Sequence, residues 1–185
     1  MQYRRIIFHA FLWFSIVITF SCNAFAQDTI GGSGNNYFWI NGGVGVGSLG
    51  LAGGAGLTWV TPDYIISVRY AANTEFNIFG PTPEESVVDV GLLYGIYSSS
   101  KYGFASIAAG LSYVNGVRRG KILANGLLGD AYEKVPFQTI GIPLEAQLIW
   151  RPFSVVGIGF YFFADINSEM SNVGGLITLQ IGYLR

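Results

Sequence analysis

Cysteine and histidine are almost absent from this sequence. The 185 residues include one of each, His9 and Cys22, and both lie in the first 26 residues. If that segment is removed on export, the remaining chain can form no disulfide and has neither imidazole nor thiolate for metal binding or nucleophilic catalysis. We therefore expect no catalytic residues, no metal site and no cofactor, and we interpret the protein as a non-enzyme.

Charged residues are also scarce, at 11% of the chain. Removing Arg4 and Arg5 with the first 26 residues leaves 8 of the 10 Lys and Arg against 11 Asp and Glu, a net charge of −3. No basic tract of the kind that binds nucleic acid is present, so we expect no nucleic-acid partner.

Long apolar runs are missing after residue 26, although 51% of the residues are hydrophobic. A membrane-spanning helix needs about 20 consecutive apolar residues. High apolarity without such runs leaves two architectures, a large buried β-structure or a β-barrel in a membrane.

The N-terminus has the three parts of an export signal. They are a basic start, an apolar run and a small-residue motif: Arg4 and Arg5, residues 6–20, and Ala24-Phe25-Ala26. The apolar run is short for a spanning helix, so the pattern predicts a cleaved signal peptide over 1–26 and one mature domain over 27–185. The alternatives are an uncleaved anchor and lipid attachment at Cys22.

The mature part contains eight segments in which apolar and small or polar residues alternate. They cover residues 36–46, 50–60, 64–75, 86–98, 102–114, 135–150, 153–166 and 173–184. In the sixth, Ile140, Ile142 and Leu144 alternate with Gly141, Pro143 and Glu145. A period of two is the signature of a β-strand with two different faces.

The small or polar faces decide between a soluble and a membrane barrel. They consist mostly of Gly, Ala, Ser and Thr with isolated charges, whereas a face in water would carry Lys and Glu repeatedly. Small residues suit a narrow lumen, and the apolar faces then meet lipid. The sequence predicts an all-β fold, an eight-stranded antiparallel up-and-down transmembrane β-barrel.

The connections alternate in length. Short, turn-rich links at 60–63, 98–101 and 151–152 alternate with links that are mostly longer, at 47–49, 76–85, 115–134 and 167–172. Short periplasmic turns and longer outer loops are typical of outer-membrane barrels. We expect both termini in the periplasm and a long outer loop over 115–134.

Aromatic residues of lipid-facing parity gather near the short-turn ends of the strands. They are Phe38, Trp59, Tyr64, Trp150 and Tyr183. Such rings favour the headgroup level of a membrane.

With these features the chain resembles the small outer-membrane barrels of the OmpA-transmembrane and OmpX-like group, from Tyr37 to Leu184. The resemblance implies a location in the cell outer membrane of a Gram-negative bacterium. It also implies contact with outer-membrane lipid and with the barrel assembly machinery.

Charges of lumen-facing parity are the candidate site residues. Arg69 and Glu145 fall at matching depth, so we expect them to form one structural ion pair in the lumen. Glu75, Asp89 and Asp165 lie towards the outer ends of their strands and predict an acidic outer rim that attracts cations, together with Asn73 and Asn167.

Loop 115–134 carries Arg118, Arg119 and Lys121 beside several leucines. Basic residues at an outer rim can contact the phosphates of lipopolysaccharide, much as cationic clusters recognise anionic headgroups. An ordinary solvated loop is the alternative.

Three functions remain open. An eight-stranded interior is just wide enough for side chains to fill it, which favours a packed lumen and a structural or surface-interaction role with an unknown envelope or surface partner. The alternative is a narrow channel for small solutes or ions. A lipid-modifying barrel enzyme is disfavoured because the mature chain lacks histidine.

Overall fold

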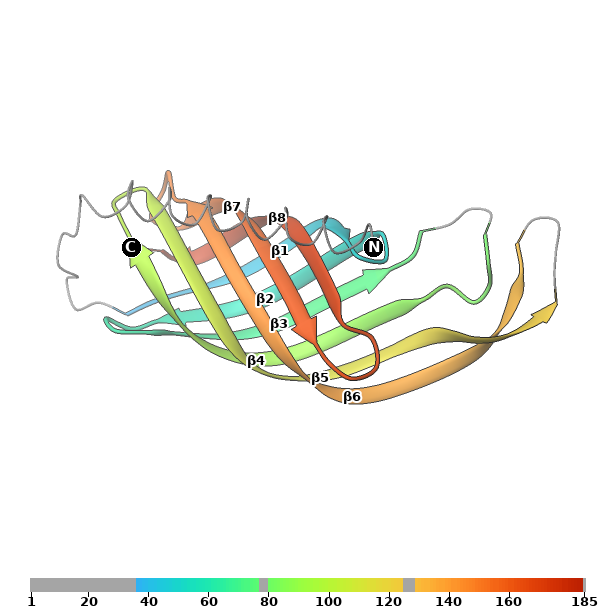
Figure 1. Cartoon of the computed structure of the whole chain (residues 1–185). Coiled ribbons are helices and arrows are strands. Elements are labelled where there is room, and N and C mark those ends of the chain that lie inside the picture. Colours follow the sequence, from blue (N-terminus) through green and yellow to red (C-terminus); the bar gives the residue numbers. More distant parts are fainter. Residues whose placement is uncertain (1–35, 77–79, 125–128, 185) are drawn as a thin grey trace, which may run out of the picture.

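The structure is a computed structural model that describes residues 36–76, 80–124 and 129–184. The predicted signal peptide and Cys22 lie outside the described residues. The described chain forms eight β-strands (Figure 1): β1 (Tyr37–Gly47), β2 (Leu51–Val60), β3 (Ile65–Thr74), β4 (Ser86–Ser99), β5 (Gly103–Ala124), β6 (Ala131–Trp150), β7 (Val156–Ile166) and β8 (Asn172–Tyr183).

The strands pair in sequence order, each antiparallel to the next, and β8 returns to β1 to close the barrel. At the seam, Phe38 pairs with Tyr183 and Gly47 pairs with Gly174. The predicted eight-stranded up-and-down barrel is confirmed. Closure leaves no unpaired strand edge around the barrel wall, which a structure surrounded by lipid requires.

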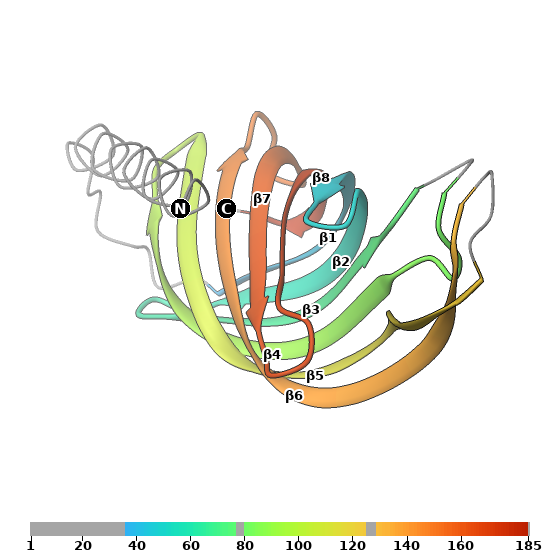
Figure 2. The same cartoon turned by 45° about the vertical axis from the view of Figure 1, so that its right-hand side comes forward.

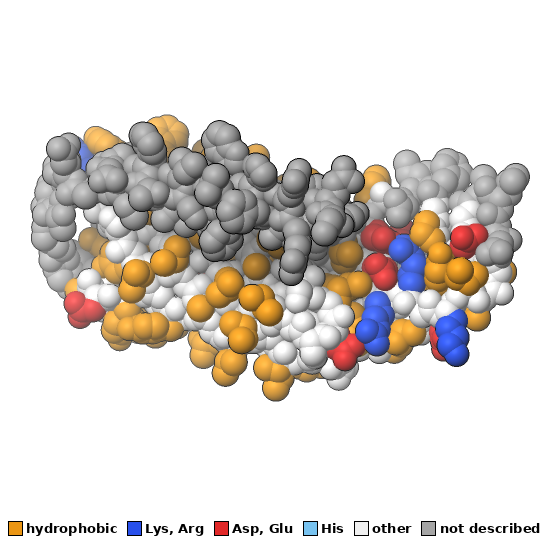
Figure 3. All heavy atoms as spheres, viewed as in Figure 1, with side chains coloured by type: hydrophobic (Ala, Val, Ile, Leu, Met, Phe, Trp, Pro, Cys, Tyr) orange, Lys and Arg blue, Asp and Glu red, His pale blue; other side chains and the backbone are white. Residues whose placement is uncertain are grey.

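Outward-facing side chains form an apolar wall around the barrel. Side chains alternate between the wall and the lumen, so that on β6 Ile140 is 73% exposed while Glu145, at the opposite parity, is 5% exposed. In Figure 3 the coloured side chains on the visible body of the barrel are almost all hydrophobic. Among the described residues no helix is long and apolar enough to cross a membrane.

Aromatic side chains mark both ends of this wall. One end, the turn end, carries the tight turns after β2, β4 and β6, and the five aromatics predicted for it lie there on the outer face. Aromatic residues also lie at the opposite end, the loop end, where none was predicted. There Tyr70 and Tyr113 both pair with Val90, and Tyr113 also pairs with Ile140.

The height of the wall can be read from β6, on whose outer face an unbroken apolar run extends from Ile140 to Trp150, with Gln138 next along that face. At about 3.4 Å per residue this stretch measures about 34 Å, or about 26 Å along the barrel axis for a strand tilt of roughly 40°. That height matches the apolar band of about 25 Å expected of an outer-membrane barrel.

The prediction that residues 115–134 form a loop is wrong. β5 continues to Ala124 and β6 begins at Ala131, so the two strands project beyond the barrel as a paired hairpin. Figure 1 shows this hairpin extending past the other strands on the right, and Figure 2 shows it curling towards the β3–β4 connection. We call residues 75–76, 80–85, 115–124 and 129–139 the outer extension.

The lumen is filled by side chains in three layers. The turn end holds a large apolar cluster that includes Trp39, Phe104 and Ile149. The middle combines polar side chains with a second cluster around Tyr161 and Phe163. At the loop end, Leu49 and Met170 pack against the buried residues Val87, Val114 and Phe137.

Glycine residues on the inner face leave room for the backbone of the neighbouring strand. A Cβ added to Gly110 would lie 1.9 Å from the carbonyl oxygen of Leu92, and one added to Gly45 would lie 2.0 Å from that of Gly175. These contacts are with backbone atoms, which cannot move aside within a closed barrel. The narrow barrel therefore requires glycine at these inward-facing positions.

Candidate functional site

A buried ion pair lies in the middle of the lumen. Both Nε and Nη2 of Arg69 donate hydrogen bonds to Oδ1 of Asp89, at 2.9 and 2.6 Å. Nη1 donates to the carbonyl oxygen of Leu144 at 2.9 Å, and the guanidinium lies over the ring of Phe163. Arg69 is 1% exposed and Asp89 is fully buried.

The predicted pairing of Arg69 with Glu145 is therefore wrong, although both side chains do face the lumen. Arg69 pairs in register with Gly91, and Asp89 follows on the same face, opposite Ala71. Asp89, on the adjacent strand β4, is thus a diagonal neighbour of Arg69 and lies closer to it than Glu145 on β6. Depth counted from strand ends also ignores the stagger between tilted strands, which shifts residues of equal count to different heights.

Glu145 is held by hydrogen bonds instead of by a cation. Nε2 of Gln147 donates to its Oε1 at 2.5 Å, the Tyr161 hydroxyl donates to Oε2, and Oγ of Ser67 lies 3.3 Å from Oε1. Three donors from β3, β6 and β7 thus converge on one carboxylate. Both oxygens of this buried carboxyl group thus have hydrogen-bond partners without a salt bridge.

The predicted acidic outer rim is also wrong for two of its three members. Asp165, like Asp89, is fully buried in the lumen. It accepts hydrogen bonds from Oγ of Ser112 and from Nδ2 of Asn167, the latter at 2.9 Å, and lies 3.9 Å from Nη2 of Arg69. The β7–β8 turn folds over the mouth through Met170, so these strand ends are covered by side chains.

Glu75 lies at the rim, but it is neutralised there. It accepts a hydrogen bond from Nη2 of Arg119 and another, at 3.2 Å, from the backbone N–H of Glu85. The same arginine donates from Nε to the carbonyl oxygen of Pro83 at 3.0 Å. Arg119 therefore joins the β3–β4 connection to β5 and is occupied in holding the outer extension together.

Two other bonds complete this link at the tip. Thr82 donates its backbone N–H to the carbonyl oxygen of Asp130 at 3.0 Å and accepts the N–H of Tyr132 at 2.7 Å. The β3–β4 connection thus contacts both strands of the hairpin. The extension is a hydrogen-bonded unit, where the sequence predicted a loop.

The other basic residues of the extension remain accessible. Arg118 is 44% exposed and lies 3.2 Å from Glu169 of the β7–β8 turn, and Lys121 is exposed. Figure 3 shows charged side chains gathered at this end of the visible face, in contrast to the apolar body. Of the three residues predicted to contact lipopolysaccharide, Arg119 alone is largely withdrawn from solvent.

Arg151 is a buried residue whose role the sequence analysis missed. It lies at the turn end, where Nη1 donates to the carbonyl oxygen of Leu184 at 2.6 Å and Nη2 donates to that of Ser100 at 2.6 Å. These bonds fasten the end of β8 to the β4–β5 turn. Its position beside Pro152 in a tight turn gave no signal of burial.

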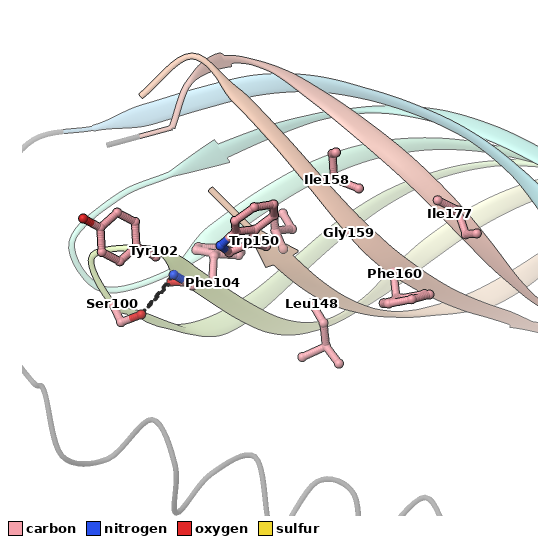
Figure 4. A pocket seen from close by; sticks show the side chains of 11 residues that line it. Ser100, Tyr102, Phe104, Leu148, Trp150, Ile158, Gly159, Phe160 and Ile177 are labelled. Atoms are coloured by element: carbon pink, nitrogen blue, oxygen red, sulfur yellow. Dashed lines mark hydrogen bonds between the residues drawn. The ribbon is translucent and has the colours of Figure 1, made fainter. Parts of the chain in front are cut away.

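A groove of about 600 Å³ lies on the outer wall near the turn end (Figure 4). Its walls include the outward-facing side chains of Leu148, Trp150, Ile158 and Phe160, with Ser100 at one end. Because these residues have lipid-facing parity, the groove belongs to the apolar wall.

The described residues contain no group of three or more His, Cys, Asp or Glu side chains arranged to hold a metal ion. Each carboxylate of the lumen has a hydrogen-bond donor of its own: Arg69 for Asp89, Ser112 for Asp165 and Gln147 for Glu145. What this arrangement can do chemically is to fix the packing of the lumen, with one carboxylate paired to Arg69 and the other two held mainly by hydrogen bonds.

No family model and no curated protein matches this sequence. Among solved structures it is similar to the N-terminal β-barrel domain of OprF from Pseudomonas aeruginosa. That match has a TM-score of 0.56 and 11% identity, and covers 82% of this chain and 100% of the other. The chain has the fold of the small outer-membrane barrels.

Neisserial surface protein A is a second such structure, with a TM-score of 0.53 and 12% identity over 79% of this chain and 96% of that one. Both similar proteins are eight-stranded outer-membrane barrels. At this identity the likeness establishes the barrel architecture, and it carries no residue roles from one protein to the other.

Proposed function

We propose that the protein is exported through a cleaved signal peptide and resides in the outer membrane. There it has a structural or surface-interaction role and conducts no solute. The observation that carries this proposal is the combination of an apolar wall about 26 Å high with a lumen packed at both ends. The fold shared with two outer-membrane barrels supports the location.

The packed lumen disfavours the alternative of a narrow channel. An ion would have to pass the apolar cluster around Trp39 and Phe104, the Arg69–Asp89 pair and the layer beneath Met170. Apolar layers present no groups that replace an ion's hydration shell. A lipid-modifying activity is disfavoured because the chain after residue 26 offers no histidine to activate a nucleophile.

The outer extension is the part of the protein that we propose to meet partners. From Tyr113 to Ala124, β5 runs about 37 Å beyond the second aromatic row. Phe76 and Leu123 there are 73% and 68% exposed, and Lys121 is exposed as well. A stiff, hydrogen-bonded projection with apolar and basic side chains is suited to binding another envelope or surface molecule.

Lipopolysaccharide is the first such partner that we propose, through phosphates bound by Arg118 and Lys121. Arg119 is excluded from direct contact because it bonds to Glu75 and Pro83. Replacing both Arg118 and Lys121 with Gln should weaken binding of purified lipopolysaccharide, most visibly at low salt. The matched control is Lys101→Gln at the turn end, and equal binding by both variants would contradict this contact.

Location and architecture can be tested together. The protein should sediment with outer-membrane vesicles in a sucrose gradient, and unheated samples should migrate differently from boiled ones on SDS gels, because a closed barrel has all its backbone hydrogen bonds within the sheet. Recovery in the soluble periplasmic fraction, or a single migration position, would overturn the proposal.

A further inference from the structure

The groove on the outer wall near the turn end is formed by neighbouring strands from β5 to β8. Gly103 of β5 pairs in register with Trp150 of β6, and Trp150 pairs in turn with Ile158 of β7. Phe160, the next outward residue of β7, pairs with Ile177 of β8. All five line the groove. The wall recedes beside the Trp150 indole, where Gly103 offers no side chain.

The two ends of this groove differ in chemistry. Figure 4 shows Ser100 and Tyr102 together at one end, with Leu148, Phe160 and Ile177 farther along the barrel. The first end lies at the turn end of the wall, where the aromatic residues mark the expected level of lipid headgroups. The other end lies toward the middle of the wall, where acyl chains are expected. The groove therefore has the polarity of a lipid molecule.

A cation lies beside the headgroup end. The ammonium nitrogen of Lys101 lies 5.2 Å from the centre of the Tyr102 ring, and Tyr102 lines the groove. Lys101 follows Ser100 directly in the β4–β5 turn and is exposed. A lysine that is held at the headgroup level attracts anionic lipids and can bind their phosphates.

Hydrogen bonds fix the shape of this end. The carbonyl oxygen of Gly103 accepts the backbone N–H of Ser100 at 2.8 Å and Nη2 of Arg151 at 2.9 Å. The N–H of Gly103 donates to Oγ of Ser100 at 3.0 Å. A site that is already formed binds its ligand without the cost of ordering its own backbone and side chains.

We propose that this groove binds one anionic phospholipid, with an acyl chain along Leu148, Phe160 and Ile177 and the phosphate beside Lys101. The proposal rests on the outer-membrane location proposed above, because only a wall in contact with lipid meets this ligand. The volume of about 600 Å³ lies within the range of about 300–1,000 Å³ that small-molecule sites occupy. A chain lying in the groove makes more van der Waals contacts than a chain against a flat wall.

Two tryptophans make this proposal measurable. Once the predicted signal peptide is removed, the chain contains Trp39, Trp59 and Trp150, of which Trp39 is buried in the lumen. Trp150 lines the groove, whereas Trp59 lies at the same end of the wall on β2, and their exposed fractions are 60% and 56%. Bromine atoms on the acyl chain of a neighbouring lipid quench tryptophan fluorescence. The variant Trp59→Phe therefore reports on the groove, and Trp150→Phe reports on the wall outside it.

The test uses each folded variant in vesicles of phosphatidylcholine that contain brominated phosphatidylglycerol as a minor component. Quenching in Trp59→Phe should show an affinity for the anionic lipid about fivefold higher than that in Trp150→Phe at low salt. With brominated phosphatidylcholine the difference between the variants should be smaller, because that headgroup has no net charge. Equal quenching of the two variants by the anionic lipid would overturn the proposal.

Two further substitutions in the Trp59→Phe variant locate the site. Lys101→Gln should remove the preference for the anionic lipid, and Lys134→Gln on the outer extension is the matched control that should retain it. Gly103→Leu should fill the groove and lower quenching by both lipids, and the backbone there has no positive φ that leucine would resist. A preference that Lys101→Gln leaves unchanged would contradict the phosphate contact.

Failure of this site can be told apart from failure of the proposed location. A protein that sediments with outer-membrane vesicles and is heat-modifiable, yet shows equal quenching in both tryptophan variants, would keep its location and lose the lipid site. Absence of quenching in both variants would contradict the location itself. If Gly103→Leu does not fold, the comparison of Trp59→Phe with Trp150→Phe decides alone.

Discussion

At the scale of single residues, the packing of the lumen centre depends on which side chain neutralises Arg69. The guanidinium places two hydrogen bonds on Asp89 and none on Glu145. Removing one partner of a buried pair strands the other charge, at a cost of about 3–5 kcal/mol, while replacing both with apolar residues costs much less. We therefore expect a double-mutant cycle of Arg69→Met and Asp89→Leu to give a coupling energy of about 2–3 kcal/mol.

Urea unfolding in lipid vesicles measures the four free energies of this cycle. The matched control is the same cycle with Glu145→Leu in place of Asp89→Leu, for which a smaller coupling energy is expected because Arg69 makes no bond to that carboxylate. A larger coupling with Glu145 than with Asp89 would contradict the pairing and restore the partner expected from sequence parity.

The Tyr161 hydroxyl provides a second residue-scale prediction. It donates to Glu145 inside the lumen, and a hydrogen bond to a charged group contributes about 1.5–3 kcal/mol. Tyr161→Phe should lower the free energy of unfolding by that amount in the same assay. Tyr113→Phe, on the outer wall and 52% exposed, is the control and should change it by less than about 0.5 kcal/mol. Equal effects would mean that the buried hydroxyl makes no such bond.

At the scale of elements, Arg119 is predicted to hold the outer extension independently of the barrel. Arg119→Met removes its bonds to Glu75 and Pro83, so the extension should open more often while the eight-stranded wall is unchanged. Proteinase K should cleave the variant within the extension roughly tenfold faster, and the temperature at which SDS unfolds the barrel should not shift.

Lys121→Met is the control for this experiment, because Lys121 is an exposed neighbour on the same strand. Its cleavage rate should equal that of the unaltered protein. If Arg119→Met instead lowered the unfolding temperature of the barrel, the extension and the wall would be one cooperative unit and the division drawn here would be wrong.

The elements also show how far the sequence could predict the structure. Within the membrane-height wall each strand separates apolar from small or polar residues, so alternation predicted all eight strands and their faces. Beyond Tyr113 this constraint ends, because both faces of the extension can carry polar groups. Asn115, Arg119 and Lys121 put polar side chains at the parity that is apolar in the wall, and the register between β5 and β6 shifts after Arg119. The paired hairpin therefore looked like a loop.

The lumen network was only partly predictable for a different reason. Parity placed Arg69 and Glu145 on the inner face, as the structure shows. Their partners, however, depend on the stagger between neighbouring strands and on how turns fold over the mouth, and a single sequence contains neither. For that reason the sequence predicts Asp89 and Asp165 at the rim, although both lie in the lumen. Nothing in the sequence marks Ser112 as a hydrogen-bond donor to Asp165, or Tyr161 as a donor to Glu145.

At the scale of the whole molecule, the protein is a closed barrel whose lumen is filled with side chains. This can be tested by measuring the conductance of the folded protein in planar lipid bilayers, with a known porin as the positive control. We expect no conductance steps above those of the protein-free bilayer, because apolar layers at both ends and the Arg69–Asp89 pair block the axis. Reproducible steps of uniform size, carried by the heat-modifiable folded form, would contradict it.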